Sequence, residues 1–385
     1  MTAAVSTARR MLAHTGRHPV VSLFLDLDPS QFATAPARAT QMRSLLDAAE
    51  RDGHGAGEWP SHADRTALSG DLERLEEYLS SDDLPVSGAR ALAVFCSGQD
   101  ELFETIALAV PTPPRAVIAS TPFIEPLVAG RDDGRIAVVL ISRRLGRILM
   151  GDPHDLREAE EVADNVHGQH SRGGWSQANY ERSADNEAEQ HFRHVAQELY
   201  HLWQRQPFQR LVVGGPVDDR GRFVEDLHQD LRRLLLDERL EADVETASLT
   251  DVGAALSPVL ERARAAGQEA ALAELENRLG AGGAAVSGLA ATLEALAERR
   301  VETLVLARNF TARGTRCPRC GLLYAESTQT CAADGETVVA VRDLREAAVE
   351  AAVMQDAGVT VIGEGADPEP PVLHRGGGIA ALLRF

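Results

Sequence analysis

The chain has 385 residues, of which 44% are hydrophobic and only 4% aromatic. This length predicts two or three domains with aliphatic cores. The net charge of −19 excludes RNA binding through the whole surface, so any contact with RNA needs a local basic patch. All 39 residues counted as Lys or Arg are arginine.

The sequence also indicates a compartment. It contains no stretch of about 18 apolar residues, so we expect no membrane span, and its first residues lack the apolar run of a signal peptide. Of the four cysteines, three cluster at 317, 320 and 331, and Cys96 stands alone in an apolar run. This is not a disulfide framework, and it fits a reducing cytosol. We therefore expect a cytoplasmic protein in which Cys96 packs in a core.

Residues 1–128 are predicted to form the first domain. Two apolar runs, 20–28 and 89–97, are typical of buried strands. Helical segments such as 71–79 lie between them, next to a loop at 52–64. Residues 119–128 are expected to be a connector that leaves the domain.

Residues 129–256 are predicted to form the second domain. It begins with a hairpin of strands 135–142 and 147–150, with a turn near Leu145 and Gly146. After a polar, His-rich loop at 165–175, apolar residues at helical spacing predict a long helix from about 176 to 206. A strand at 208–216 ends in Gly-Gly-Pro, and a helix is expected over 224–240.

Residues 257–385 are predicted to form the third domain. Helices are expected at 257–279, 289–300 and 343–357, strands at 301–307 and 359–363, and a Gly-rich loop at 280–288. An acidic, Pro-rich loop at 364–371 precedes the tail 376–385. Because helices alternate with strands throughout, we predict an α/β fold.

The cysteine segment reads Cys317-x2-Cys320-x10-Cys331-x2-Asp334. Two such knuckles, each followed by glycine, predict a closed, structural zinc ribbon at about 313–340, with a carboxylate as the fourth ligand. The alternative is a knuckle pair that has lost its metal and remains as a short hairpin.

A second motif is the loop before the long helix, His-Gly-Gln-His-Ser-Arg-Gly-Gly-Trp-Ser-Gln. Adjacent glycines allow backbone amides to approach a ligand, and the start of the helix favours anions. Read alone, the motif is also compatible with an ordinary loop. The positive residues that we expect to contact RNA are His167, His170, Arg172 and Arg182 around the loop, with Arg143 and Arg144 of the hairpin. The alternative for the two hairpin arginines is a solvated face.

The segment HSRGGWSQANYERSADNEAEQHFRHVAQEL resembles the middle-domain loop and helix of the archaeal and eukaryotic class-1 peptide-chain release factors, including their bacterial relatives. Four further segments resemble that family in order: 20–29, 134–149, 280–307 and 376–385. The resemblance implies a ribonuclease-H-like middle domain and an α/β/α last domain with an inserted zinc ribbon. It also implies that Gly173, Gly174 and Trp175 promote hydrolysis of peptidyl-tRNA; Gln177 can replace the family's glutamine only if the register of the loop shifts.

The sequence departs from that family at three points, of which one is its acidic net charge. Trp175 occupies the place of the glutamine in the Gly-Gly-Gln loop. Its backbone amide can serve as the same donor, but its indole either fills the water site or stacks on a base. The Asn-Ile-Lys-Ser loop that reads stop codons is absent, so we expect no codon specificity.

Two functional hypotheses follow from the resemblance. The first is a ribosome-associated factor that hydrolyses peptidyl-tRNA on stalled ribosomes, with the ribosome, the tRNA acceptor end and a translational GTPase as partners. The second is a non-catalytic ribosome-binding factor of the hibernation or Pelota type. A third reading, from another class, is a metal-stabilised adaptor outside translation.

Overall fold

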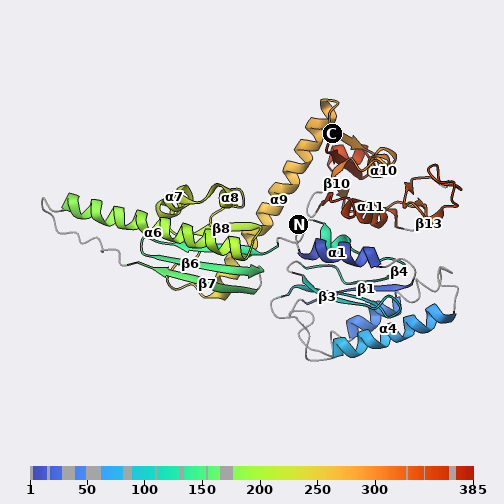
Figure 1. Cartoon of the computed structure of the whole chain (residues 1–385), viewed down its shortest axis with the longest axis horizontal. Coiled ribbons are helices and arrows are strands. Elements are labelled where there is room, and N and C mark those ends of the chain that lie inside the picture. Colours follow the sequence, from blue (N-terminus) through green and yellow to red (C-terminus); the bar gives the residue numbers. More distant parts are fainter. Residues whose placement is uncertain are drawn as a thin grey trace. The chain divides into compact units, whose positions relative to one another are not determined.

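The structure is a computed structural model that describes residues 3–14, 18–27, 40–48, 62–80, 89–108, 111–129, 134–152, 155–164, 177–326, 328–341, 343–363 and 370–385, with only the backbone at 3–4, 14, 62, 65, 80, 152 and 177–184. The chain divides into two compact units (Figure 1). Unit 1 comprises Met1–Asp132 and Ala265–Phe385, and unit 2 comprises Asp133–Arg264. Each unit contains helices and sheets, so the α/β class is confirmed. The predicted three-domain division stays a prediction.

The first sheet of unit 1 is built from the N-terminal part of the chain. Its strand order is β3-β2-β1-β4, and all pairs are antiparallel. The strands predicted at 20–28 and 89–97 are confirmed as β1 and β2, whereas β3 and β4 were not predicted. The elements of this part are α1 (Ala3–His14), β1 (Val20–Asp26), α4 (His62–Ser80), β2 (Ala91–Ser97), β3 (Leu102–Leu108), β4 (Arg115–Ala119) and α5 (Glu125–Val128), with a further helical stretch at 40–48.

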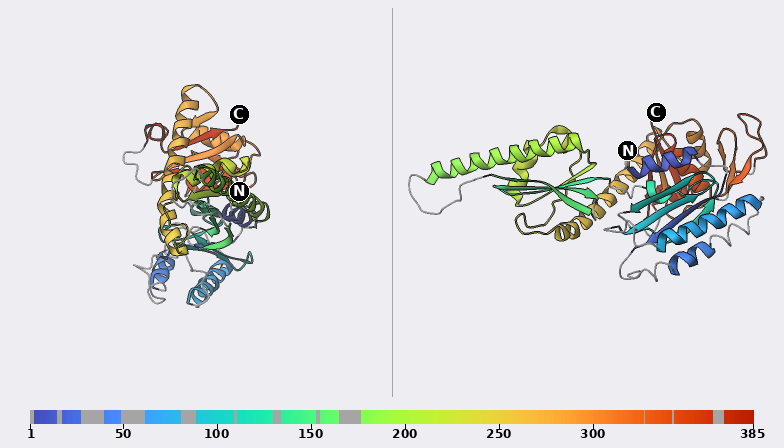
Figure 2. Two further views of the ribbon diagram at one scale, coloured as in Figure 1. Left: turned by 90° about the vertical axis from the view of Figure 1, so that its left-hand side faces the viewer. Right: turned by 60° about the horizontal axis from the view of Figure 1, so that its bottom comes forward.

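Helices cover both faces of this sheet, and Figure 2 (right) shows α1 and α4 on opposite sides of it. On the α4 face, Leu75 packs in one cluster with Leu23 and Cys96, so the core position predicted for Cys96 is confirmed. On the other face, Met11 of α1 packs in a cluster with Phe24. Successive side chains of a strand point to opposite faces, which explains why β1 is apolar at nearly every position. Two predictions need correction: α4 begins inside the expected loop at 52–64, and the expected connector at 119–128 contains α5.

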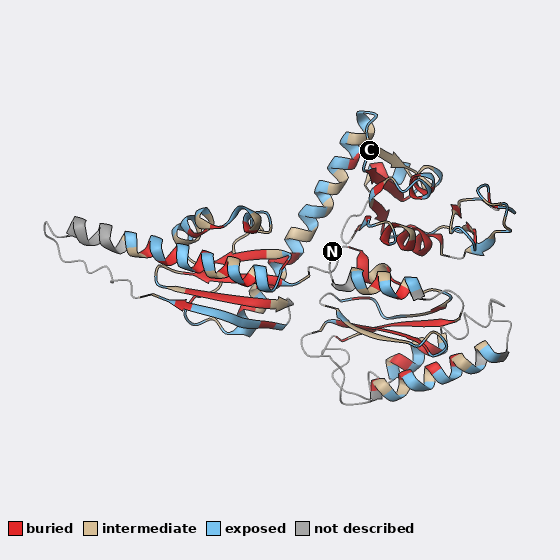
Figure 3. Ribbon diagram, in the orientation of Figure 1, coloured by how far each residue is buried: buried red, intermediate tan, exposed pale blue. Residues whose placement is uncertain are grey.

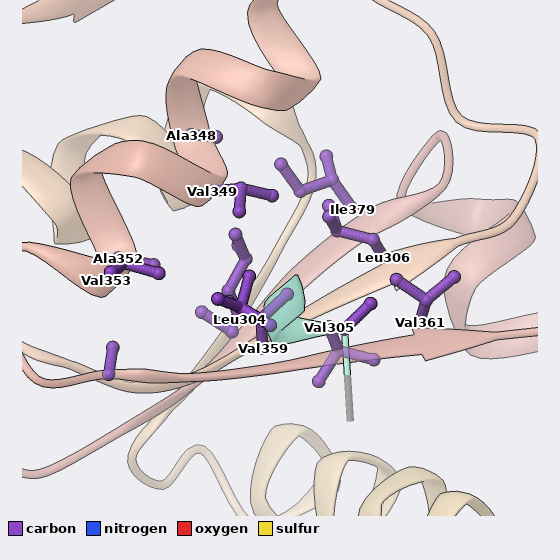
Figure 4. Packing of buried hydrophobic residues seen from close by; sticks show 14 of the residues in the cluster. Leu304, Val305, Leu306, Ala348, Val349, Ala352, Val353, Val359, Val361 and Ile379 are labelled. Carbon is purple, nitrogen blue, oxygen red and sulfur yellow. The ribbon is translucent and has the colours of Figure 1, made fainter. Parts of the chain in front are cut away.

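The second sheet of unit 1 comes from the C-terminal part of the chain. Its order is β14-β10-β15-β9, with β10 and β14 parallel and the other pairs antiparallel. Figure 4 shows Ala348, Val349, Ala352 and Val353 of α11 beside the apolar side chains of this sheet. The elements are β9 (Ala285–Ser287), α10 (Leu289–Ala297), β10 (Val301–Ala307), α11 (Leu344–Val353), β14 (Gly358–Ile362), α12 (Pro371–Arg375) and β15 (Ile379–Leu383). The Gly-rich loop expected at 280–288 is therefore partly wrong, because it contains the edge strand β9.

A buried charged network joins α11 to the segment that follows β4. The Arg345 guanidinium donates to both carboxylate oxygens of Glu125, at 2.5 and 2.8 Å. The backbone N–H of Ile124 donates to Glu346, and the Thr121 hydroxyl donates to Glu350, each at 2.5 Å. Because these groups are shielded from water, their mutual hydrogen bonds fix the segment against the helix.

Unit 2 has one four-stranded sheet of order β7-β6-β5-β8, in which β5 pairs antiparallel with β6 and parallel with β8. The predicted hairpin exists, but its turn is at 142–144. Leu145 and Gly146, where the turn was expected, already belong to β6 and pair with the neighbouring strands. The reason is local: Ser142 and Leu145 exchange hydrogen bonds that close the turn. The strands are β5 (Ile136–Ile141), β6 (Leu145–Asp152), β7 (Asp155–Ala163) and β8 (Arg210–Gly214).

The helices of unit 2 include α6, which matches the predicted long helix. The single helix predicted over 224–240 is wrong, because Leu227 adopts an extended backbone (φ −64°, ψ 140°) between α7 and α8. The chain then runs beside β8, where Leu235 and Leu240 form parallel bridges to it. Pairing with the open sheet edge thus replaces helix continuation. The helices are α6 (Gln177–Arg205), α7 (Val217–Asp226), α8 (Gln229–Arg232) and α9 (Leu249–Gly280), whose two halves belong to different units.

Candidate nucleic-acid interface and metal site

Most of the predicted loop lies outside the described residues. This holds for Gly173, Gly174, Trp175, His167, His170 and Arg172. Gln177 and Arg182 belong to the first turns of α6, where only the backbone is described. The structure therefore describes the frame from which this loop departs and to which it returns: the end of β7 and the start of α6.

The helix α6 is held by one continuous apolar face. Its 29 residues span about 43 Å at 1.5 Å per residue. The face is buried from Ala188 onward, and Figure 3 shows it as a stripe along the helix. On the sheet side, Gly146 of β6 leaves no room for a side chain, because an added Cβ would lie 2.5 Å from Val195. The close approach at Gly146 fixes how α6 lies on the sheet.

A His–Asp–His group ties the departing end of the loop to this helix. Asp164 follows β7 directly, and its Oδ2 accepts hydrogen bonds from Nδ1 of His191 at 2.7 Å and of His194 at 3.2 Å. The hydrogen bond from His191 is the main reason why the pKa of Asp164 lies below its usual value. The His191 side chain is fully buried, and its Nε2 has no hydrogen-bond partner among the described residues.

This group was not among the predicted sites. The signal was present as the pair of histidines three residues apart in HFRH, which places both rings on one helix face. Their acidic partner lies 27 residues before the first of them, on the far side of the loop. Only the fold brings it close.

The two hairpin arginines predicted to contact RNA are described, and both are paired with acids. Arg143 lies 2.5 Å from a carboxylate oxygen of Asp185 in α6, and Arg144 lies 3.1 Å from Glu245. A third arginine of the hairpin, Arg147, is buried and pairs with Glu158. The exposed pairs are weak in water, so they leave Arg143 and Arg144 able to exchange partners.

The cysteine segment forms a small three-stranded sheet of order β12-β11-β13, consisting of β11 (Gly314–Arg316), β12 (Leu323–Tyr324) and β13 (Val339–Val341). At one end of it, the donor atoms of Cys317, Cys320, Cys331 and Asp334 all lie within 4.8 Å of one another. The predicted ligands are thus brought together.

The two knuckles have equivalent backbones. Gly321 N–H donates to the carbonyl of Cys317, and Gly335 N–H donates to that of Cys331, each at 3.0 Å. Both glycines have positive φ, 78° and 71°, which explains the glycine at this place in each knuckle. Asp334 therefore occupies the position in the second knuckle that Cys320 occupies in the first.

The chemistry of the group fits a metal ion. A tetrahedral zinc with Zn–S bonds of about 2.3 Å holds its sulfur ligands about 3.8 Å apart. The sulfur atoms of Cys320 and Cys331 are 3.4 Å apart, and that of Cys317 is 3.4 Å from Asp334. The backbone N–H of Glu336, then the Cys331 thiol, lower the pKa of Asp334 to about 2, so this ligand is charged at neutral pH. The Tyr324 hydroxyl donates a hydrogen bond to the Cys331 sulfur and lowers the pKa of this thiol. The lower pKa favours the thiolate, which is the form that binds metals.

Among the described residues, no helix combines the length and apolar character needed to cross a membrane.

Comparison with known proteins gives one family. The model of the bacterial archaeo-eukaryotic release factor family 10 matches residues 122–268, which include the whole of unit 2. No curated protein matches the chain.

Solved structures similar to the chain include the archaeal translation termination factor aRF1, with 19% identity over 99% of this chain and 97% of that chain and a TM-score of 0.27. Pelota of Archaeoglobus fulgidus has 18% identity over 77% and 79% of the two chains and a TM-score of 0.35. Dom34 of S. cerevisiae has 10% identity over 77% and 79% and a TM-score of 0.42. At these scores the likenesses support no statement about function. Over residues 122–268 the chain is similar to this family of bacterial relatives of the archaeal and eukaryotic release factors, in agreement with the resemblance found in the sequence.

Proposed function

We propose that this protein is a cytoplasmic, ribosome-associated factor that acts on peptidyl-tRNA in stalled ribosomes without reading a codon. The observation that carries the proposal is the family match over residues 122–268, since this range contains the Gly-Gly-Trp loop and the helix that follows it. The proposed partners are the ribosome, the acceptor end of tRNA and a translational GTPase.

The fold of unit 2 supports the ribonuclease-H-like assignment of the middle domain. Three antiparallel strands, β7, β6 and β5, are followed in space by the parallel strand β8. The parallel bridges of Leu235 and Leu240 then continue the sheet beyond β8. In this arrangement α6 is the connection between β7 and β8, and the loop precedes it directly.

The proposed chemistry is hydrolysis of the ester bond between peptide and tRNA. A water molecule attacks the ester carbonyl, and a backbone N–H near Gly174 and Trp175 stabilises the oxygen that gains negative charge. Loss of one such donor costs about 10²–10³ in rate. Gly173 and Gly174 let the loop enter a crowded RNA pocket, and Gln177 is proposed to assist at the start of α6. His167, His170, Arg172 and Arg182, with Arg143 and Arg144, are proposed to contact RNA.

Zinc is the proposed structural ion of Cys317, Cys320, Cys331 and Asp334. Three thiolates and one carboxylate form a closed ligand set, which suits a structural site rather than a catalytic one. It holds together the ribbon inserted in the last of the three proposed domains.

The deciding experiment is release of labelled peptide from ribosomes that hold peptidyl-tRNA and have an empty A site. We expect release above the buffer rate, equal for ribosomes programmed with sense and stop codons. The Gly174→Ala variant is expected to bind ribosomes but to release the labelled peptide slowly. A clear preference for stop codons would contradict codon-independent action.

The replacement of glutamine by Trp175 favours a second function, that of a non-catalytic ribosome-binding factor. In that case the indole stacks on an unpaired base, and Trp175→Ala weakens ribosome binding by about 1–3 kcal/mol. Wild-type protein that binds ribosomes but releases no more peptide than buffer does would establish this second function over the first.

A further inference from the structure

A cavity of about 890 Å³ lies within unit 1. It is formed where α1, the segment after β4, the ends of α10 and α11, and the first cysteine knuckle meet. Its volume falls within the range of sites that bind small ligands or peptide side chains, about 300–1,000 Å³.

The apolar part of this cavity is aliphatic. Its lining includes Leu12, Leu293 and Leu296 from the helices, and no aromatic side chain is among the described residues that line it. Two further lining residues, Val339 and Met354, are 51% and 44% exposed, so part of the apolar lining is open to solvent. An aliphatic surface of this sort suits aliphatic side chains, and it offers no ring on which a nucleobase could stack.

The charged part of the lining is positive. It contains Arg299, Arg316 and Arg319, and one acid, Glu350; Arg319 also lies 3.1 Å from Glu336, which is outside the lining. Glu350 is only 4% exposed, and its oxygens already accept hydrogen bonds from Arg316 and Thr121. In a chain of net charge −19, a concave surface with excess arginine attracts a negatively charged ligand.

Arg299 is held in a conformation that favours glycine. It follows the end of α10 with φ 59°, and the next residue donates its N–H back to the carbonyl of Ala295. This is the helix-ending motif in which glycine is the usual residue, because a Cβ is strained there. The guanidinium of Arg299 has no hydrogen-bond or ion-pair partner among the described residues.

The end of α11 provides the comparison. Asp356 has the same conformation, with φ 60°, but its side chain forms an ion pair with Arg9 of α1 at 2.5 Å. A non-glycine residue at Asp356 therefore serves an internal contact. Arg299 lines the cavity, and no internal contact of its side chain with the described residues accounts for a non-glycine residue at this position. A ligand in the cavity would supply such a contact.

We propose that this cavity binds an acidic peptide segment of a partner protein. A carboxylate of the peptide pairs with Arg299, and a neighbouring aliphatic side chain packs on the leucines and Met354. Polyanionic RNA is the less suitable occupant, because the cavity has no stacking ring and its exposed surface is partly aliphatic. The site does not depend on the function proposed above.

The test uses the full-length protein with zinc in the buffer and three fluorescent probes, read by polarisation. The probes are a hexapeptide Glu-Asp-Leu-Leu-Asp-Glu, the matched peptide with Lys at each acidic position, and an oligouridine RNA. We expect saturable binding of the acidic peptide alone. Arg299→Gly should weaken that binding by roughly tenfold, the effect of one charge-assisted hydrogen bond.

Arg299→Gly also separates binding from folding. Because glycine relieves the strain at this position, we expect the melting temperature of unit 1 to stay equal or to rise by roughly 2–4 °C while binding is lost. Met354→Asp should weaken binding as well. Arg375→Ala, which removes an exposed arginine outside the cavity, is the matched control and should change nothing.

Three results would overturn the proposal. The first is no saturable binding of the acidic peptide below about 1 mM. The second is equal binding of the acidic and basic peptides, or unchanged binding by Arg299→Gly. The third is preferential binding of the RNA with loss in Arg299→Gly, which would assign the cavity to nucleic acid instead.

Discussion

Replacing Glu125 by alanine should destabilise unit 1 far more than the loss of an ordinary ion pair. The Glu125 side chain is 17% exposed, and that of its partner Arg345 is 9% exposed. The Arg345 guanidinium also donates to the carbonyls of Ala307, Arg308 and Phe310, so it cannot move into water when the carboxylate is removed. A buried charge is then left without compensation, which typically costs about 3–5 kcal/mol.

Hydrogen exchange measured by mass spectrometry is the appropriate assay, because it reports each unit separately. A loss of about 3–5 kcal/mol speeds exchange of the most protected amides by roughly 10² to several times 10³. We expect this acceleration for peptides of β10 and α11. Peptides of β5 and β8, in unit 2, serve as the internal reference and should be unchanged.

The matched control is Glu298→Ala. Glu298 pairs with Arg300 at 2.6 Å, but its side chain is 49% exposed, so its removal should cost less than about 1 kcal/mol. If Glu125→Ala accelerates exchange no more than Glu298→Ala does, the burial argument for the Arg345 network is wrong.

Three further predictions concern the other sites. Purified protein should contain one zinc per chain, and Asp334→Ala should weaken zinc binding without abolishing it, because three thiolates remain; metal analysis that finds no zinc in folded protein would exclude the site. Burial, then the neighbouring Glu350, raises the pKa of Glu346 well above its usual value. The folded state therefore holds this proton more tightly than the unfolded state does, and the group's contribution to stability is fully present below about pH 4.3. As the pH rises toward the folded pKa, this contribution to the free energy of unfolding is lost by at most about 1.4 kcal/mol per pH unit. The Glu346→Gln variant keeps an acceptor for the Ile124 N–H and does not titrate. Its stability relative to wild type, measured by urea unfolding, should therefore increase with pH. A difference that is constant with pH would contradict a protonated Glu346. Asp164→Asn should weaken the anchoring of the loop to α6 and speed exchange of the amides around residue 164, whereas unchanged exchange there would show that the two histidines do not hold it.

The sequence predicted those elements whose local pattern agrees with their environment. β1, β2, β10 and β14 are apolar runs because they are buried on one or both faces. β7 was not predicted, since its sequence DLREAEEVA has only two buried positions and its remaining side chains are exposed. Such charged strands are typical of sheet edges, where they discourage pairing with other chains, and they carry little hydrophobic periodicity.

The cysteine group and the Asp164–His191–His194 group also differ in how far local sequence predicts them. The metal group could be predicted because each knuckle is local: the spacing of two residues and the glycine that follows fix its backbone. The Asp164–His191–His194 group could not, because it joins a strand end to the middle of a helix across the intervening loop. Periodicity and motif spacing describe neighbours along the chain, and only the fold of unit 2 makes these three residues neighbours in space.

The cysteine ribbon is linked to the core of unit 1 through one residue. Arg316 immediately precedes Cys317, and its guanidinium donates to Glu350 at 2.7 Å. Glu350 is nearly fully buried, and its carboxylate oxygens accept hydrogen bonds from this arginine and from the Thr121 hydroxyl. If the knuckle unfolds, Glu350 keeps only the neutral partner, and the cost of its burial rises. The Arg316–Glu350 pair therefore links the cysteine ribbon to the charge network that holds the segment after β4 against α11.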